Sequence, residues 1–138
     1  MLDAIQALES HFKEEAYARI FGMTIVELCS GRAVIKMQVT EEMNNIFGST
    51  HGAAIFSLMD AAFELTVNSH GTVAVALSVN LSYLNATHAG TTLIAEGREV
   101  NRSRKISACE IRVTDESGKL IATAQTLAYR KADPLPFL

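Results

Sequence analysis

Residues 51–69 read HGAAIFSLMDAAFELTVNS, and the pattern of this stretch decides the fold. Apolar residues fall on almost every side of a helix with 3.6 residues per turn, which predicts a helix buried in the protein. Ser49 or Thr50 is suited to cap its start. Three polar residues in the middle of the stretch fall on one narrow stripe, because successive positions turn by about 100°. They are Ser57, Asp60 and Glu64.

Alternating bulky and small side chains predict a long strand directly after this helix, over residues 72–84. Alternation and turn signals predict further strands at 24–29, 33–39, 91–101, 106–114 and 120–129. The tail at 133–136 reads DPLP, and we expect it to stay out of the sheet interior because proline cannot donate a ladder hydrogen bond.

The first twenty residues carry a second helical pattern, with apolar residues at spacings of three and four, and Gly22 is expected to end it. The spaced residues are Leu2, Ile5, Leu8, Phe12, Ala16 and Ile20. Strands that follow one another without intervening helices favour an antiparallel sheet over βαβ units. The sequence therefore predicts one α+β domain over residues 1–138. A curved antiparallel sheet wraps around the long central helix, and a helix precedes it.

Composition excludes several function classes. A net charge of -3 argues against nucleic-acid binding, which needs a basic surface. Residues 65–95 lack charge, but polar residues interrupt them too often for a membrane span. Cys29, Cys109 and the histidines lack metal-ligand spacing, so we expect no metal and no cofactor. The charged N-terminal segment is no secretory signal, and a cytoplasmic location is expected.

Asp60 is the first candidate for chemistry. A carboxylate in a buried helix costs several kcal/mol unless it is paired, and no Lys or Arg lies within a turn of it. It is either functional, or bonded to a distant backbone amide, or turned to solvent. Glu64 lies one turn further and is either a second active carboxylate or an exposed group at the helix end. A like charge at that distance raises one of the two pKa values.

The helix start offers the second candidate. Amides at a helix N-terminus are free and carry partial positive charge, so they can stabilise an oxyanion. Gly52 has no Cβ and would let a substrate approach its amide, or it is simply a loop glycine. Asn45 is a functional loop residue or a turn residue, and Ser78 is functional or only small.

Together these residues resemble the hotdog-fold thioesterases of the PaaI type. In that family an Asn is followed six residues later by His-Gly-Gly, and an Asp comes eight residues after the first Gly. Asn45, His51, Gly52 and Asp60 meet these spacings, and Ser78 matches a Ser found eighteen residues after the Asp in some relatives. The similarity extends through residues 56–60, 62–63 and 77–79 to the closing strands. Ala53 stands where the second Gly is usual.

The resemblance implies a hotdog fold and hydrolysis of an acyl-CoA thioester. Gly52, with Asn45, would polarise the carbonyl, Asp60 would act as general base or as nucleophile, and Ser78 would position water. His51 would lie near the substrate as a structural hydrogen-bonding residue. The active site would lie between two subunits of a homo-oligomer, a dimer or a homotetramer.

The CoA phosphates need cations, and the tight basic cluster of Arg102, Arg104 and Lys105 suits them, although a solvated strand turn explains it equally well. A hotdog dehydratase or hydratase, with His51 as its base, and a non-catalytic acyl-CoA-binding protein are the alternatives. The acyl group stays open. Four large side chains could line an aryl pocket or a fatty-acyl tunnel, or fill the core: Phe47, Phe56, Met59 and Phe63.

Overall fold

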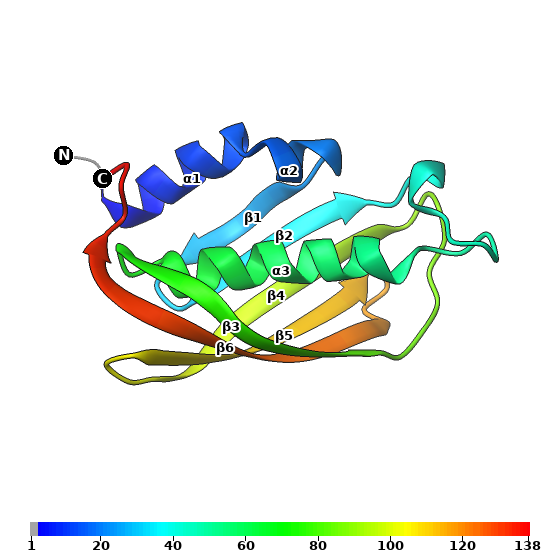
Figure 1. Cartoon of the computed structure of the whole chain (residues 1–138). Coiled ribbons are helices and arrows are strands. Elements are labelled where there is room, and N and C mark those ends of the chain that lie inside the picture. Colours follow the sequence, from blue (N-terminus) through cyan, green and yellow to red (C-terminus); the bar gives the residue numbers. More distant parts are fainter. Residues whose placement is uncertain (1–2) are drawn as a thin grey trace.

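A long helix, α3 (Gly52–Asn68), runs across the concave side of one curved antiparallel sheet in the computed structural model, which describes residues 3–138 (Figure 1). The strands are β1 (Thr24–Cys29), β2 (Arg32–Gln38), β3 (Thr72–Tyr83), β4 (Thr92–Arg102), β5 (Ile106–Asp115) and β6 (Leu120–Pro134). They lie in the order β1-β2-β4-β5-β6-β3. This is the α+β hotdog architecture that the sequence predicts.

The apolar sides of α3 fill the core. Leu58, Met59 and Ala62 have no exposed surface. The helix approaches the sheet closely at Gly97 in β4, where a methyl group would lie 2.5 Å from Thr66 Oγ1 and 3.1 Å from the Ala62 carbonyl oxygen. Because such contacts are too short for any side chain, glycine at this position sets how deeply the helix sits in the sheet.

Strand β3 lies at the edge of the sheet. It pairs with β6 along its whole length, from Thr72 opposite Pro134 to Tyr83 opposite Ala122. Its other side pairs with no strand among residues 3–138. Val75 and Leu77 of β3 are large apolar residues that remain exposed. An open, apolar edge of this length is a surface that another strand can pair with.

The end of β6 lies further along the chain than the sequence predicted. The strand continues through Asp133 and Pro134, whereas the sequence placed its end at Tyr129. Proline is tolerated here because β5 pairs with β6 only up to Tyr129, so β3 alone pairs with Pro134. Pro134 thus stands at an edge of the sheet and not in its interior.

The N-terminal helical pattern forms two helices, α1 (Ala4–Glu14) and α2 (Ala16–Ile20), and a short 3₁₀ helix, η1 (Glu41–Met43), precedes α3. Glu15 adopts an extended conformation between α1 and α2, so the predicted single stripe is broken. Leu8 and Phe12 are buried as expected, but Ile20 is 75% exposed. After the break a different side of α2 faces the core, and Ala18 is buried instead. Leu2 lies outside the described residues. Gly22 ends the region with φ of 65°.

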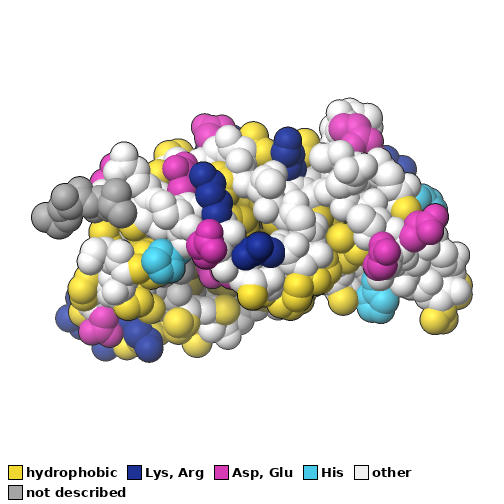
Figure 2. Space-filling model, turned by 90° about the horizontal axis from the view of Figure 1, so that it is seen from above, with side chains coloured by type: hydrophobic (Ala, Val, Ile, Leu, Met, Phe, Trp, Pro, Cys, Tyr) yellow, Lys and Arg dark blue, Asp and Glu magenta, His cyan; other side chains and the backbone are white. Residues whose placement is uncertain are grey.

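Helix α1 packs along β1 (Figure 1). Figure 2 shows the surface on this side of the molecule, where charged side chains of both signs are scattered among apolar ones. No helix in the described part of the chain is long and apolar enough to cross a membrane.

Candidate active site

The start of α3 is capped by His51, and not by Ser49 or Thr50 as the sequence suggested. The His51 Nδ1 atom accepts a hydrogen bond from the Ala53 amide at 3.0 Å. The His51 carbonyl oxygen accepts from the amides of Ala54, at 3.0 Å, and Ile55, at 3.4 Å. His51 is therefore a structural hydrogen-bonding residue, as expected, and its Nε2 atom is the only ring nitrogen left for other contacts.

Gly52 carries the free donor of this helix start. Within residues 3–138 its amide has no hydrogen-bond acceptor, while the next three amides are all bonded to His51. One amide with partial positive charge is thus available for an external oxygen atom. The space beside its Cα is not open, however. The ring of Tyr83 fills it, and a methyl group on Gly52 would lie 3.2 Å from that ring.

Asn45 shapes the loop before the helix. Its Oδ1 accepts hydrogen bonds from the amides of Phe47, at 2.8 Å, and Ser49, at 3.1 Å, and its Nδ2 donates to Ser49 Oγ at 3.0 Å. The His51 amide closes the base of the loop by donating to the Met43 carbonyl oxygen at 2.7 Å. One N–H of the Asn45 amide group remains for an external acceptor, because the group has two.

Asp60 lies eight residues after Gly52 and is half-buried. Burial, and to a lesser degree the negative charge of Glu15, raise the pKa of its carboxyl above the ordinary value of 3.8. No ion pair to Asp60 occurs among the described residues. A carboxylate that is partly desolvated and lacks a cation is a stronger base than one in water.

Glu64 lies one turn beyond Asp60 and is more exposed than it. Partial burial, contact with the Glu15 carboxyl and the charge of Asp60 raise the pKa of Glu64 to about 8. The third member of the stripe, Ser57, is buried and donates to the Ala53 carbonyl oxygen. Tyr17 of α2 reaches it with its hydroxyl 2.9 Å from Ser57 Oγ. The stripe therefore faces the junction of α1 and α2, a relationship that the sequence alone did not indicate.

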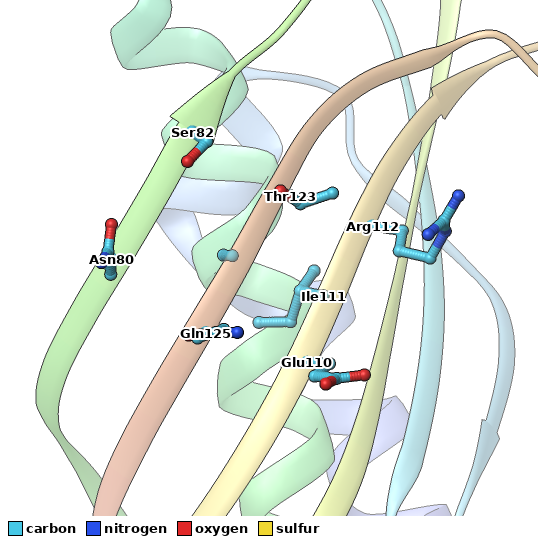
Figure 3. A pocket seen from close by; sticks show the side chains of 8 residues that line it. Asn80, Ser82, Glu110, Ile111, Arg112, Thr123 and Gln125 are labelled. Atoms are coloured by element: carbon cyan, nitrogen blue, oxygen red, sulfur yellow. The ribbon is translucent and has the colours of Figure 1, made fainter.

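Ser78 does not join these groups within one chain. It pairs with the exposed Leu127, and alternate residues of a strand point to the same side of a sheet. Ser78 thus shares a side with Asn80 and Ser82, which stand in front of the sheet while α3 lies behind it (Figure 3). Facing away from Asp60 of its own chain, Ser78 gains no support from this geometry for a water-positioning role.

The predicted basic cluster lies in the β4–β5 hairpin, at the opposite end of α3 from Gly52 (Figure 1). Arg104 and Lys105 line a cavity of about 650 Å³, which Arg102 does not line. The same cavity contains two further cations that sequence analysis missed, Arg130 and Lys131 of β6. The sequence did contain a signal for them, because Arg130 and Lys131 are adjacent and come directly after the predicted last strand. Arg130 also donates to the carbonyl oxygens of Ser103 and Arg104, which braces the hairpin.

The four large side chains considered for an acyl pocket divide into two pairs. Met59 and Phe63 are buried in the core. Phe56 is 38% exposed on α3, and Phe47 is 84% exposed at the tip of the Asn45 loop. Cys29 and Cys109 are unlinked thiols. No group of three or more potential metal ligands occurs among residues 3–138.

Comparison with known proteins places the chain in a family. Residues 47–122 match the model of the thioesterase superfamily. An Archaeoglobus fulgidus protein that is named putative esterase is 36% identical over 91% of this chain and 81% of its own length. The acyl-coenzyme A thioesterase PaaI of Escherichia coli is 31% identical over 92% of this chain and 91% of its own length.

The solved structure of Escherichia coli PaaI superposes with a TM-score of 0.91, covers 95% of each chain and is 30% identical. The protein smu.793 of Streptococcus mutans, solved with acetyl CoA bound, has a TM-score of 0.79 and 26% identity, and covers 83% of this chain and 92% of its own. Fold, helix start and sequence similarity agree, and the chain belongs to the thioesterase superfamily as a hotdog protein of the PaaI type.

Proposed function

We propose that this protein hydrolyses an acyl-CoA thioester to a free acid and CoA. The observation that carries the proposal is the content of α3: an unpaired amide at Gly52 and, on the same helix, the unpaired and half-buried carboxyl group of Asp60. An oxyanion donor and a base are the two groups that thioester hydrolysis requires. The activity of PaaI from Escherichia coli and the acetyl CoA bound by smu.793 support the choice of substrate.

The proposed reaction begins with the thioester oxygen at the Gly52 amide, which binds the negative charge that develops on it. Asp60 either takes a proton from a water molecule that attacks the carbonyl carbon, or attacks that carbon itself and forms an anhydride that water then cleaves. In both routes the C–S bond breaks, the sulfur leaves as the thiol of CoA after taking up a proton, and the acid is released. Asn45 adds a second donor for the carbonyl oxygen.

One chain does not bring these groups together. Eight residues at 1.5 Å rise separate Gly52 from Asp60 by about 12 Å along the helix axis, too far for both to reach one carbonyl. We therefore place the site between two subunits that pair through the open edge of β3. An antiparallel pair of β3 strands would put the Thr72 end of one beside the Tyr83 end of the other. The Gly52 of one subunit would then approach the Asp60 of its partner. Further association to a homotetramer is part of this proposal.

The same arrangement gives the basic cavity a role. Thr72 lines this cavity together with Arg104, Lys105 and Lys131, and Tyr83 contacts Gly52. Pairing of the β3 strands would thus place the cations of one subunit near the Gly52 end of the other. We propose that the cavity binds the CoA phosphates, because Arg and Lys side chains recognise phosphate oxygens by charge-assisted hydrogen bonds. His51, with Nε2 free, would contact the bound substrate.

A cytoplasmic location belongs to the same proposal, and the unlinked thiols of Cys29 and Cys109 suit a reducing compartment.

The test is a thiol-release assay with a panel of aryl, short-chain and long-chain acyl-CoAs, combined with analysis of the acyl product. Release of CoA thiol and free acid at equal rates is expected. A dehydrated or hydrated acyl group still attached to CoA would instead identify a hotdog dehydratase or hydratase. Binding of acyl-CoA without turnover by the oligomeric protein would identify a non-catalytic binding protein.

A further inference from the structure

Tyr83, which is not part of the thioesterase motif, makes two contacts with Gly52. Its hydroxyl donates a hydrogen bond to the Gly52 carbonyl oxygen at 3.2 Å. Its Cε1 and Cζ atoms lie 3.2 Å from the position that a Cβ on Gly52 would occupy. Apart from the residues next to Gly52 in the chain, the three atoms nearest to that position all belong to Tyr83. The phenol therefore packs against the bare Cα of the residue that carries the free amide.

We propose that Tyr83 is a positioning residue that fixes the place of Gly52, and with it the free amide, relative to the sheet, an inference that rests on the proposed function. Glycine has the largest conformational freedom of any residue, and Gly52 is the first residue of its helix. The capping bonds of His51 go to the three amides after Gly52 and leave the Gly52 amide itself free. The amides of Ala54 and Ile55 hold the His51 carbonyl, which shares a rigid peptide plane with the Gly52 N–H. Tyr83 holds the other side of Gly52, with its ring against the Cα and its hydroxyl on the carbonyl oxygen of the next peptide plane.

The strand behind Tyr83 makes this restraint firm. Tyr83 is the last residue of β3 and pairs with Ala122 of β6, which has no exposed surface. The preceding β3 residues pair continuously with β6 back to Ser78. A side chain on a paired strand is held in a more precise position than a side chain on a loop. The position of Gly52 is thus fixed relative to the sheet as well as relative to its own helix.

Precision matters here because an oxyanion donor acts at about 2.7–3.1 Å from the charged oxygen. A displacement of about 1 Å at a reacting group costs about a hundredfold in rate. Tyr83 does not touch the reacting atoms in this scheme. It acts through Gly52, so its loss should lower kcat more than it raises KM, since the donor contributes most when charge develops on the oxygen.

The first experiment is a double-mutant cycle on kcat. Tyr83→Phe keeps the ring and should lower kcat about tenfold or less, and Tyr83→Ala should lower it about a hundredfold, with KM within about threefold of the wild type. Gly52→Ala should be costly in the wild-type protein because its methyl group meets the ring. In the Tyr83→Ala background, where the ring is gone, the same change should cost less than about threefold.

Ser82→Ala is the matched control, because Ser82 is the neighbouring residue of β3 and faces the other side of the sheet. It should leave kcat unchanged. Two outcomes would each overturn the proposal: Gly52→Ala costing the same factor in both backgrounds, or Tyr83→Ala retaining the wild-type kcat. Thermal unfolding of every variant identifies those that fail to fold, and Tyr83→Phe preserves the packing if Tyr83→Ala does not.

A second measurement separates this inference from the proposed function. In the free protein, the backbone ¹⁵N order parameter of Gly52 should fall from about 0.85, typical of a rigid backbone, to below about 0.6 in Tyr83→Ala and stay high in Ser82→Ala. A wild-type protein that hydrolyses no acyl-CoA would refute the proposed function while this readout still holds. An unchanged order parameter in Tyr83→Ala would refute the positioning role even in an active enzyme.

Discussion

The Nδ1 atom of His51 lies 3.0 Å from the amide nitrogen of Ala53 and accepts its hydrogen bond, so this ring nitrogen is committed to holding the helix start. A histidine with Nδ1 as acceptor carries its proton on Nε2 when neutral. Such a residue can donate to a substrate but has no free lone pair to act as a general base. This arrangement distinguishes a thioesterase that uses a carboxylate from a dehydratase that would use His51.

The cap leads to the first prediction. His51→Ala should lower the free energy of unfolding by about 1 kcal/mol, the usual cost of losing a capping side chain. His51→Asn supplies a carboxamide oxygen in place of Nδ1, so it should restore stability and retain most of kcat. Urea unfolding and acyl-CoA hydrolysis check the pair. If His51→Asn is stable but as inactive as a variant of Asp60, His51 is a catalytic base and the assignment fails.

Asp60 and Glu64 lie one turn apart on α3, and the second prediction separates them. Asp60→Asn removes the base or nucleophile and should lower kcat by at least about a hundredfold with little change in KM. Because it also removes a half-buried carboxyl group that has no cation, stability should be unchanged or higher. Glu64→Gln should keep most activity. The reverse result, an active Asp60→Asn and an inactive Glu64→Gln, would exchange the two roles.

Glu64 should also make stability depend on pH. Its pKa is raised from the ordinary 4.5 to about 8, so the folded protein holds this proton more tightly than the unfolded chain. The stability that results is fully present below about pH 4.5 and is lost as pH rises through 8. Glutamine resembles the protonated form, so the melting temperature of Glu64→Gln should fall less between pH 5 and 9 than that of the wild type. An identical fall in Glu14→Gln and Glu64→Gln would refute this.

A fourth prediction concerns the basic cavity. Neutralising Arg104, Lys105 and Lys131 together to Gln should raise KM for acyl-CoA far more than it lowers kcat, because the contacts are remote from the reacting carbon. Arg130 is left intact, since it braces the hairpin. A truncated acyl-pantetheine thioester, which lacks the nucleotide, should show no change. Lys13→Gln on α1 is the control. Equal effects on both substrates would exclude phosphate binding.

The proposed site between two subunits leads to the last prediction. Asp60→Asn and Gly52→Val should each be inactive, but mixed subunits should regain activity, because a mixed dimer contains one site with both groups intact. Co-expression with two different affinity tags isolates the mixed species. Light scattering should show a dimer or a tetramer in all of them. An active monomer at micromolar concentration, or mixed dimers without activity, would contradict a site between subunits.

The sequence predicted the parts of this molecule that depend on periodicity. The alternation from Val73 to Tyr83 and the apolar surface of α3 were sufficient for the architecture, because each pattern has one way to be buried. The break at Glu15 was not foreseeable, since the apolar spacing continues through it. The direction of Ser78 also depends on register shifts in the β3–β6 pairing, which no spacing in the sequence reveals.

In the candidate site, too, some features follow from the sequence and others only from the fold. Gly52 and Asp60 are candidates because of their spacing along one helix, which local sequence fixes. Their surroundings come from residues far away in the chain: Glu15 beside Glu64, Tyr83 against Gly52, and Lys131 beside Lys105. Such contacts are consequences of the sheet order β5-β6-β3 and of the path of α1 and α2. A sequence without its fold provides no basis for choosing which tyrosine, glutamate or lysine fills each of these positions.

The absence of a side chain at Gly97 has an effect on residues that it never touches. Position 97 lies directly under the carbonyl of Ala62, two residues after Asp60. Replacing Gly97 with alanine would leave every proposed active-site residue in place in the sequence, yet the helix that carries both Gly52 and Asp60 would have to lift away from β4. Each of those groups would then move relative to β3, and so relative to its counterpart in the other subunit. One hydrogen atom in the middle of the sheet would thereby set the width of the cleft that we propose between two subunits.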